Sequence, residues 1–306
     1  MKDKERHAYE KWTDGIAYEV AFWNNACRWT KTFMSTMRWS HLGSVICLEG
    51  FDANRFLLSQ PAGKVLDVGC GMSFATGNFV GEGKVRKPLD IHYVDPLAHY
   101  FNAIAARHKR ELPTIEFGMM EHLSAFFPNQ DTALVIIQNA LDHSSEPIKG
   151  VIEALQTVRI GGVVYLNHHP NEAETEHYKG FHQYNINEDN GHLIIWNQEG
   201  RSDVTDMLKP FATMEVNRQL DTGHIIAVIH KKAAVPSQAK NDKTDIHSLC
   251  EKMMTSQRKA QSIGHAVKYK LKYWAFNTIQ FFAQSLSYET KMKLKKLIRQ
   301  DSQSHE

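Results

Sequence analysis

The sequence predicts an α/β fold: a doubly wound, Rossmann-like and mostly parallel sheet that ends in an antiparallel hairpin. Five short apolar runs, typical of strands buried on both faces, follow one another at intervals of roughly 20–30 residues. Segments with helical spacing lie between these runs, and such alternation is typical of a parallel sheet covered by helices. Two further β-like runs, at 213–219 and 224–230, surround a short turn and predict the closing hairpin.

The predicted elements follow in chain order. Residues 1–60 are expected to be helical, because aromatic residues recur close to i, i+4 spacing. The strands of the parallel sheet are predicted at 65–69, 91–95, 114–117, 133–138 and 162–168. Helices are predicted at 74–80, 97–110, 147–158 and 203–211. An insertion at 169–202 is expected to contain a hairpin of its own, at 180–186 and 192–197. Long ordered insertions at the carboxyl edge of a sheet usually build a site.

The charge distribution divides the chain. The formal net charge is +2, but residues 1–229 hold 21 Lys and Arg against 28 Asp and Glu, whereas residues 230–306 hold 15 against 6. We therefore expect three parts: a helical N-terminal lid at 1–60, a ligand-binding domain at 61–232, and a linker with a basic helical tail at 233–306. The acidic part contains the fold pattern, so the basic part is expected to locate the protein or its substrate.

Bulk features exclude several classes of protein. The four cysteines are widely spaced and form no C-x-x-C pair, which argues against a disulfide framework or a cysteine zinc site. The first residues, MKDKERHAYEKW, lack the apolar region of a secretory signal. No stretch approaches the roughly 20 apolar residues of a membrane span. We expect a cytoplasmic protein that is soluble or at most peripheral on the inner face of the membrane.

The strongest local signal is a glycine-rich turn after the first strand. The run Val65–Gly69 leads into Gly69-Cys70-Gly71, where the backbone can approach a ligand closely. Asp95 ends the next predicted strand, 28 residues after Asp67, and would lie beside this turn. There its carboxylate could accept hydrogen bonds from both ribose hydroxyls of a nucleoside. A lone G-x-G is equally typical of a simple tight turn.

VLDVGCGMS at 65–73, together with YVDP at 93–96, resembles the class I S-adenosylmethionine-dependent methyltransferases. The resemblance covers roughly residues 60–230, including the terminal hairpin, and implies S-adenosylmethionine as the cofactor. It implies an acid near the methionine amino group, two glycines along the methionine moiety, and an acid-proline pair at the ribose: Asp67, Gly69, Gly71, Asp95 and Pro96. The third glycine of the dinucleotide fingerprint is absent, which disfavours a nicotinamide cofactor.

Two further positions follow from the resemblance. After the third strand the family often has an acid that meets the adenine amino group, but here Met119 and Met120 occupy that place. The adenine would then be held by backbone amides and Met120, or by Glu121, although methionines are equally typical of core filling. After the fourth strand the family's backbone passes the sulfonium, which implies that Asn139 and Leu141 lie near the cofactor.

Histidines cluster where an acceptor would lie. Methyl transfer is an in-line displacement, and a hydroxyl acceptor benefits from a general base, for which His is suited. The candidate catalytic residues are His143, His169 and His182. The structural alternatives to a catalytic role are that Asp142-His143-Ser144 caps the following helix and that His169 is an ordinary loop residue. Residues 168–185 also offer His and Glu in a metal-like spacing, but the glutamates are more typical of a solvated helix start, so no metal site is predicted.

The acceptor is the least specified feature. Residues 182–185 would alternate on a strand and turn one polar or aromatic pair inward, which suits a saccharide or another polyol hydroxyl. NALDHSSEP, with the later insertion, loosely resembles uncharacterised methyltransferases linked to bacterial surface-polysaccharide synthesis. The alternatives are a non-catalytic protein that binds a nucleoside or S-adenosylmethionine, and a methyltransferase for nucleic acid or another small molecule. Nucleic acid is disfavoured because Asn139-Ala140-Leu141-Asp142 is not the N/D-P-P-Y of base-methylating enzymes.

The basic tail at 268–299 has three interpretations. Apolar residues recur there at helical spacing, with lysines clustered at both ends. The segment could be a helix packed on the body, or a basic amphipathic helix lying on an anionic membrane. Lysines interleaved with aromatic residues could also meet nucleic acid, which is the least favoured interpretation.

Overall fold

The computed structural model describes residue 12, residues 15–28, 41–178 and 181–236, and residues 246, 248 and 251. The chain divides into two units, Met1–Gln257 and Arg258–Glu306, and every described residue belongs to the first. The predicted basic tail at 268–299 therefore lies outside the described residues, as does nearly all of the segment 233–306.

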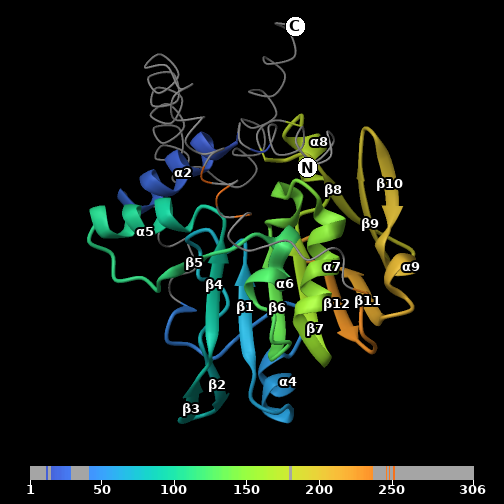
Figure 1. Ribbon diagram of the computed structural model, residues 1–306, viewed down its shortest axis with the longest axis horizontal. Coiled ribbons are helices and arrows are strands. Elements are labelled where there is room, and N and C mark those ends of the chain that lie inside the picture. Colours follow the sequence, from blue (N-terminus) through green and yellow to red (C-terminus); the bar gives the residue numbers. More distant parts are fainter. Residues whose placement is uncertain are drawn as a thin grey trace, which may run out of the picture. The chain divides into compact units, whose positions relative to one another are not determined.

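A seven-stranded sheet forms the centre of the first unit (Figure 1). Its strand order is β11-β12-β7-β6-β1-β4-β5. The parallel strands are β1 (Lys64–Val68), β4 (Ile91–Asp95), β5 (Ile115–Phe117), β6 (Thr132–Gln138) and β7 (Val158–His168). The last two strands, β11 (Ala212–Arg218) and β12 (Ile225–Lys231), form an antiparallel hairpin whose strand β12 pairs antiparallel with β7. The predicted fold class is confirmed, terminal hairpin included.

Successive residues of the central strands point to opposite faces of the sheet, and both faces are covered. Leu66 and Val68 of β1 pack on the face that carries α7 (Pro147–Thr157), α6 (Leu123–Phe126) and the short helix η2 (Met120–His122). Val65 points to the other face, where Ile46, Leu48 and α4 (Ala53–Ser59) cover it. Burial on both sides explains why the strands are continuous apolar runs.

The helix predicted at 74–80 is absent. Turns follow β1 instead, and then β2 (Phe79–Glu82) pairs with β3 (Val85–Pro88) in a separate two-stranded ribbon. Phe74 has φ +45° and Gly77 has φ +80°, so both lie in the left-handed region, which a right-handed helix excludes. The predicted helices at 97–110 and 203–211 are present as the shorter α5 (Ala98–Arg107) and α9 (Val204–Leu208).

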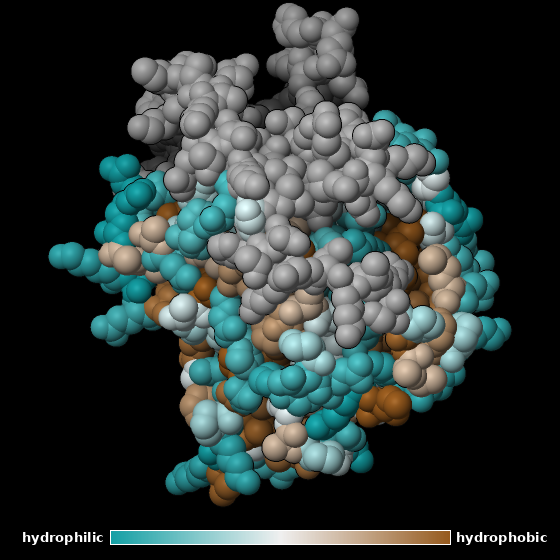
Figure 2. Space-filling model, in the orientation of Figure 1, coloured by the Kyte–Doolittle hydropathy of each residue, from teal (hydrophilic) through white to brown (hydrophobic). Residues whose placement is uncertain are grey.

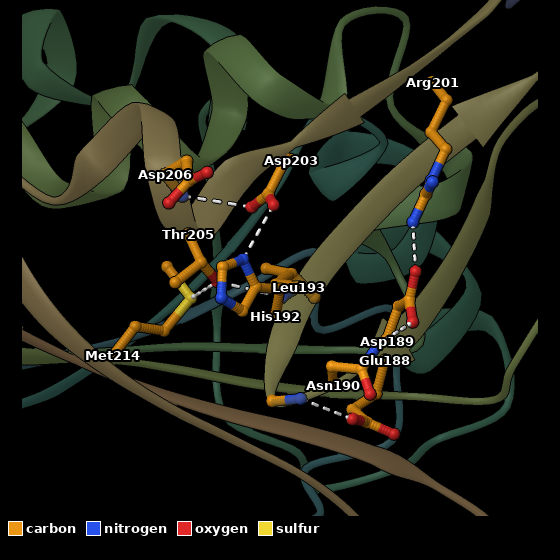
Figure 3. Close-up of polar contacts among 11 residues, drawn as sticks. Glu188, Asp189, Asn190, His192, Leu193, Arg201, Asp203, Thr205, Asp206 and Met214 are labelled. Atoms are coloured by element: carbon orange, nitrogen blue, oxygen red, sulfur yellow. Dashed lines mark hydrogen bonds and ion pairs between the residues drawn. The ribbon is translucent and has the colours of Figure 1, made fainter.

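The insertion after β7 contains a three-stranded antiparallel sheet rather than a single hairpin. A short helix, α8 (Glu172–Thr175), precedes β8 (Asn185–Asp189), β9 (His192–Asn197) and β10 (Gly200–Asp203). The first strand starts at Asn185 and not near 180, so residues 182–184 do not alternate on a strand as predicted. Figure 3 shows how the end of the insertion is fastened: Nδ1 of His192 lies 2.7 Å from Oδ2 of Asp203, and the Leu193 N–H donates to Oγ1 of Thr205.

The N-terminal segment contributes α2 (Ile16–Arg28), which lies beside α5 (Figure 1). Trp23 of α2 packs edge-on against Phe101 of α5, with ring centroids 6.2 Å apart. On the face in Figure 2, hydrophilic residues predominate over the described surface, and hydrophobic ones are scattered among them. Within the described ranges, no helix is both long and apolar enough to cross a membrane.

Candidate functional site

A cavity of about 250 Å³ lies at the carboxyl edge of β1, β4 and β6. Crevices at this edge are the usual binding sites of open parallel sheets. The segments that follow the three strands all contribute to its wall, and so do α2 and the start of the insertion. The sequence-predicted residues that line it are Gly69, Gly71, Asp95, Pro96, Met120, Glu121, Asn139 and His143.

Both glycines of the G-x-G turn are required by the backbone itself. Gly69 has φ +68° and Gly71 has φ +53°. A Cβ on Gly69 would lie 2.4 Å from Cβ of Ala140, and one on Gly71 would lie 2.6 Å from the Trp23 ring. The turn is therefore packed on both sides, and only glycine fits at either position.

Asp95 ties this turn to the end of β4. Its Oδ2 accepts a hydrogen bond from the Gly71 N–H at 3.0 Å, and its Oδ1 accepts one from the Leu97 N–H at 2.8 Å. Burial raises the pKa of Asp95 to about 7. Each carboxylate oxygen can accept more than one hydrogen bond, so both retain capacity toward a ligand in the cavity.

Asp67, predicted near the methionine amino group, is buried in β1 and is not among the described residues that line the cavity. Burial, together with the negative charge of Asp95, raises its pKa to about 7. Two buried acids thus lie close to each other beneath the G-x-G turn. A cation bound above them would favour their ionised forms.

At the other end of the cavity, Glu121 has a structural role. Its Oε1 accepts hydrogen bonds from Oγ of Ser144 at 2.6 Å and from the N–H and Oγ of Ser145 at 2.8 and 2.9 Å. Glu121 therefore anchors the connection that precedes α7 while lining the cavity. Met120 likewise has a structural role while it lines the cavity, because its side chain packs in the hydrophobic core.

The segment after β6 carries the polar groups nearest to the insertion. Asn139 lines the cavity, and its Oδ1 accepts from the His169 N–H at 3.1 Å. Leu141 is completely buried and is not among the lining residues described. Its predicted contact with the cofactor stays a prediction.

His143 and His182 meet at one buried carboxylate. Nδ1 of His182 lies 2.7 Å from Oδ2 of Asp142, and Nε2 of His143 lies 3.5 Å from the same oxygen. The two imidazole rings are edge-on, 4.5 Å apart. Burial acts to raise the pKa of Asp142, but the charges of His143 and His182 outweigh it and lower the value to about 2. Asp142 is therefore an ionised partner for both imidazoles at neutral pH.

Of the three candidate bases, only His143 lines the cavity. His182 joins it through Asp142. His169 lies elsewhere: its ring packs edge-on against His224 at 4.4 Å, and Nδ1 of His224 is 3.1 Å from Oε2 of Glu49. The structure thus brings two of the candidates together and separates the third.

The capping alternative for Asp142-His143-Ser144 is only partly right. Helix α7 begins at Pro147 after Glu146, which makes no side-chain capping bond. Ser144 Oγ accepts from the Glu146 N–H at 3.1 Å, so the serine supports the connection, but Asp142 is directed to the histidines. An Asp-His pair a few residues after a buried strand is the signal that could have identified Asp142.

The sequence prediction did not include the aromatic wall of the cavity. Trp12 stacks on Phe181 with centroids 5.3 Å apart and an interplanar angle of 19°, and both line the cavity. Glu19 and Trp23 of α2 complete this side, with Nε1 of Trp23 donating to Oε1 of Glu19 at 2.8 Å. These residues are far from the strand ends along the chain, so no local motif marks them.

No family model matches this chain, and no curated protein matches it. Solved structures are similar over part of it. A protein of Pyrococcus horikoshii is 15% identical, with 58% of this chain and 87% of that chain covered and a TM-score of 0.35. A SAM-dependent methyltransferase of Thermotoga maritima, a possible histamine N-methyltransferase, is 14% identical over 69% and 99% of the two chains, with a TM-score of 0.37.

The SAM-bound amino pentose methyltransferase CalS10 of Micromonospora echinaspora is 14% identical, with 58% of this chain and 88% of that chain covered and a TM-score of 0.34. The chain covers 42% of a 16S rRNA methyltransferase of T. thermophilus, which was solved with AdoMet and guanosine. Identities and TM-scores this low decide neither activity nor acceptor.

Proposed function

We propose that this chain is an S-adenosylmethionine-dependent methyltransferase that methylates a hydroxyl group. One observation carries the proposal: the G-x-G turn, held by the bond from the Gly71 N–H to Asp95, lies in the same cavity as His143. A cofactor site and a base are thus adjacent at the carboxyl edge of a parallel sheet, where ligands of such folds bind.

The charge and surface of the cavity suit this cofactor. S-adenosylmethionine carries a positive sulfonium and a positive ammonium group. Three carboxylate side chains, Glu19, Asp95 and Glu121, line the cavity and favour a cationic ligand. The adenine ring requires flat, polarisable contacts, which the lining residues Phe101, Met119 and Met120 offer. Because α2 supplies part of this wall, we assign the N-terminal segment the role of a lid.

Methyl transfer to a hydroxyl requires the protein to align the acceptor with the methyl group and to provide a base. The acceptor oxygen attacks the methyl carbon, the carbon–sulfur bond breaks, and its electron pair stays on sulfur as the neutral thioether. The hydroxyl proton must leave the acceptor, and His143 is the imidazole that faces the cavity. The ionised Asp142 beside it stabilises the imidazolium that forms.

For the acceptor we favour a saccharide or another polyol. Each of the two alternating pairs predicted on residues 182–185 includes a side chain directed to the protein, because Tyr184 Oη donates to the Ser145 carbonyl and Asn185 Nδ2 to Tyr178 Oη. The support comes instead from the Trp12–Phe181 pair beside His143, whose ring lies 5.6 Å from that of Phe181. A ring-shaped acceptor could stack on this aromatic face with a hydroxyl toward the imidazole.

The test uses the full chain with methyl-labelled S-adenosylmethionine and a panel of acceptors: free and nucleotide-linked sugars, small phenols and RNA. We expect cofactor binding by calorimetry and label transfer to a saccharide, with loss of transfer in His143→Ala and retention in His169→Ala. Binding without transfer to any acceptor would favour the non-catalytic alternative. Transfer to RNA alone would overturn the saccharide assignment, and an absence of binding would overturn the function.

A further inference from the structure

The group around Asp142 has the composition of a metal site. Asp142, His143 and His182 each offer one ligand atom, and these atoms all lie within 4.8 Å of one another. They come from the short helix η3 (Leu141–His143), which follows β6, and from the insertion, so the tertiary fold alone brings His182 to the other two. Asp142 is 3% exposed, and the side chains of both histidines are only about one quarter exposed.

Several buried polar atoms of this group and of the neighbouring His168 have no hydrogen-bond partner among the described residues. Oδ1 of Asp142 and Nε2 of His143 are buried and accept or donate no hydrogen bond among the described residues. Both ring nitrogens of His168 also have no hydrogen-bond partner among the described residues. His168 is 1% exposed and lies at the end of the neighbouring strand β7. Because buried polar atoms in proteins are nearly always paired, a concentration of such atoms points to a bound polar species.

We propose that Asp142, His143 and His182 bind a divalent transition-metal ion of the Zn²⁺ class. Two imidazole nitrogens and one carboxylate oxygen are a ligand set of catalytic zinc sites, which leave the fourth position open. Mg²⁺ and Ca²⁺ prefer oxygen ligands and fit this set poorly.

The distances agree with this ligand set. Around a tetrahedral zinc ion with bonds of about 2.0–2.2 Å, ligand atoms lie about 3.3–3.5 Å apart. Nε2 of His143 and Oδ2 of Asp142 are already 3.5 Å apart. Nδ1 of His182 and the same oxygen are 2.7 Å apart, a hydrogen-bond distance, so they must separate by less than about 1 Å as the ion replaces the shared proton.

The site deepens the proposed function, and only this consequence rests on that function. With the ion bound, His143 is a ligand rather than the free base. A bound ion would lower the pKa of an acceptor hydroxyl coordinated to it and so supply the activation that the free base otherwise provides. Ion binding itself requires neither cofactor nor acceptor.

A second group in the same unit serves as the matched control. His192, Asp203 and Asp206 (Figure 3) also bring three ligand atoms within 4.8 Å of one another, but Asp206 is exposed. Here the carboxylate is already satisfied, because Asp203 accepts from both His192 and the Asp206 N–H. We assign no ion to this group.

The experiment titrates Zn²⁺ by calorimetry, and Co²⁺ by its visible d–d absorption, into the untagged, chelator-treated full chain without cofactor. We expect one tight equivalent in the wild type and in His192→Ala. In His182→Ala and Asp142→Asn the affinity is expected to fall by more than about tenfold. The tetrahedral Co²⁺ spectrum is expected to disappear with it. Thermal unfolding of each variant identifies loss of binding through misfolding, and His182→Ala is the informative variant because its side chain is less buried.

Three results would overturn the proposal: no tight ion in the wild type, tight binding that survives in folded His182→Ala, or binding that is lost in His192→Ala instead. Preference for Mg²⁺ over Zn²⁺ would overturn the assigned metal class. S-adenosylmethionine binding is measured separately on the same samples. A chain that binds the cofactor but no ion refutes this inference alone, and one that binds the ion but no cofactor refutes only the proposed function.

Discussion

Nδ1 of His182 and Oδ2 of Asp142 lie 2.7 Å apart, although the two residues are 40 positions apart in the chain. This contact fastens the part of the insertion that precedes β8 to the short helix that follows β6. The amide N–H of the next residue, Gln183, also donates to the Asp142 carbonyl, at 3.4 Å. The same part of the insertion therefore places Phe181 at the cavity wall and His182 at the buried carboxylate.

Asp95→Ala is expected to weaken binding of S-adenosylmethionine by at least about tenfold, which corresponds to about 1.4 kcal/mol. The change removes a predicted ribose acceptor and also frees the N–H groups of Gly71 and Leu97. Calorimetry measures the affinity. Asp131→Ala is the matched control, because Asp131 is an exposed acid next to the start of β6, at the opposite edge of the sheet from the cavity. Equal affinity in wild type and Asp95→Ala would refute the assignment.

His143→Ala is expected to lower kcat by about 10²–10⁴-fold with little change in cofactor affinity, because a base or a ligand of the activating ion is lost. His182→Ala should lower it less, since His182 acts through Asp142. His169→Ala should leave turnover intact. If all three variants keep full turnover on the true acceptor, the hypothesis that these histidines take part in catalysis is wrong.

Asp67→Asn is expected to flatten the pH dependence of stability. The pKa of Asp67 is raised from 3.8 to about 7, so the folded state holds its proton more tightly than the unfolded chain. This contribution to stability is complete below about pH 4 and is lost as the pH rises through 7. Urea unfolding at pH 5 and pH 8 should show the wild type losing roughly 1–3 kcal/mol more than the variant. Equal losses in both proteins would contradict the shift.

Gly69→Ala is expected to destabilise the fold by roughly 1–3 kcal/mol more than Gly191→Ala. Both glycines have positive φ, +68° and +79°, so both substitutions carry the same backbone strain. A Cβ at Gly69 meets Ala140 at 2.4 Å, whereas nothing lies within 4 Å of one at Gly191. Chemical denaturation compares the two variants, and similar values would mean that the turn yields to the added methyl.

Vesicle flotation separates the two leading interpretations of the basic segment at 268–299, because a membrane-bound helix binds anionic vesicles and a helix packed on the body does not. Flotation of the full chain should succeed with phosphatidylserine-containing vesicles and fail with phosphatidylcholine alone, because the lysines supply the attraction. Substitution of the four lysines between 291 and 296 by glutamine should abolish flotation. Flotation that ignores lipid charge would exclude this role, and a salt-dependent gel shift tests the nucleic-acid interpretation.

The strands were predictable because the sheet is buried on both faces, which makes each parallel strand a continuous apolar run. The segment 74–80 was not, because its composition is compatible with a helix. Two tertiary features exclude one: the left-handed backbone of Phe74, and the close approach of Gly77 to Val45, whose carbonyl oxygen would lie 2.7 Å from a Cβ on that glycine. Similarly, β10 was not predicted as a strand, because it pairs with β9 through backbone hydrogen bonds and its partly exposed residues show no apolar run.

Along the chain, the positions of Gly69, Gly71 and Asp95 were enough to predict that they lie together at one cavity, because the carboxyl ends of neighbouring parallel strands meet at one edge of the sheet. The partners of His143 were decided only by tertiary structure. Asp142 adjoins it in sequence, but His182 reaches the same carboxylate through the docking of the insertion, and Trp12 reaches Phe181 across 169 positions. The position of a residue at the end of a predicted strand indicates which edge of the sheet it occupies, whereas contacts between distant loops depend on packing that no local pattern records.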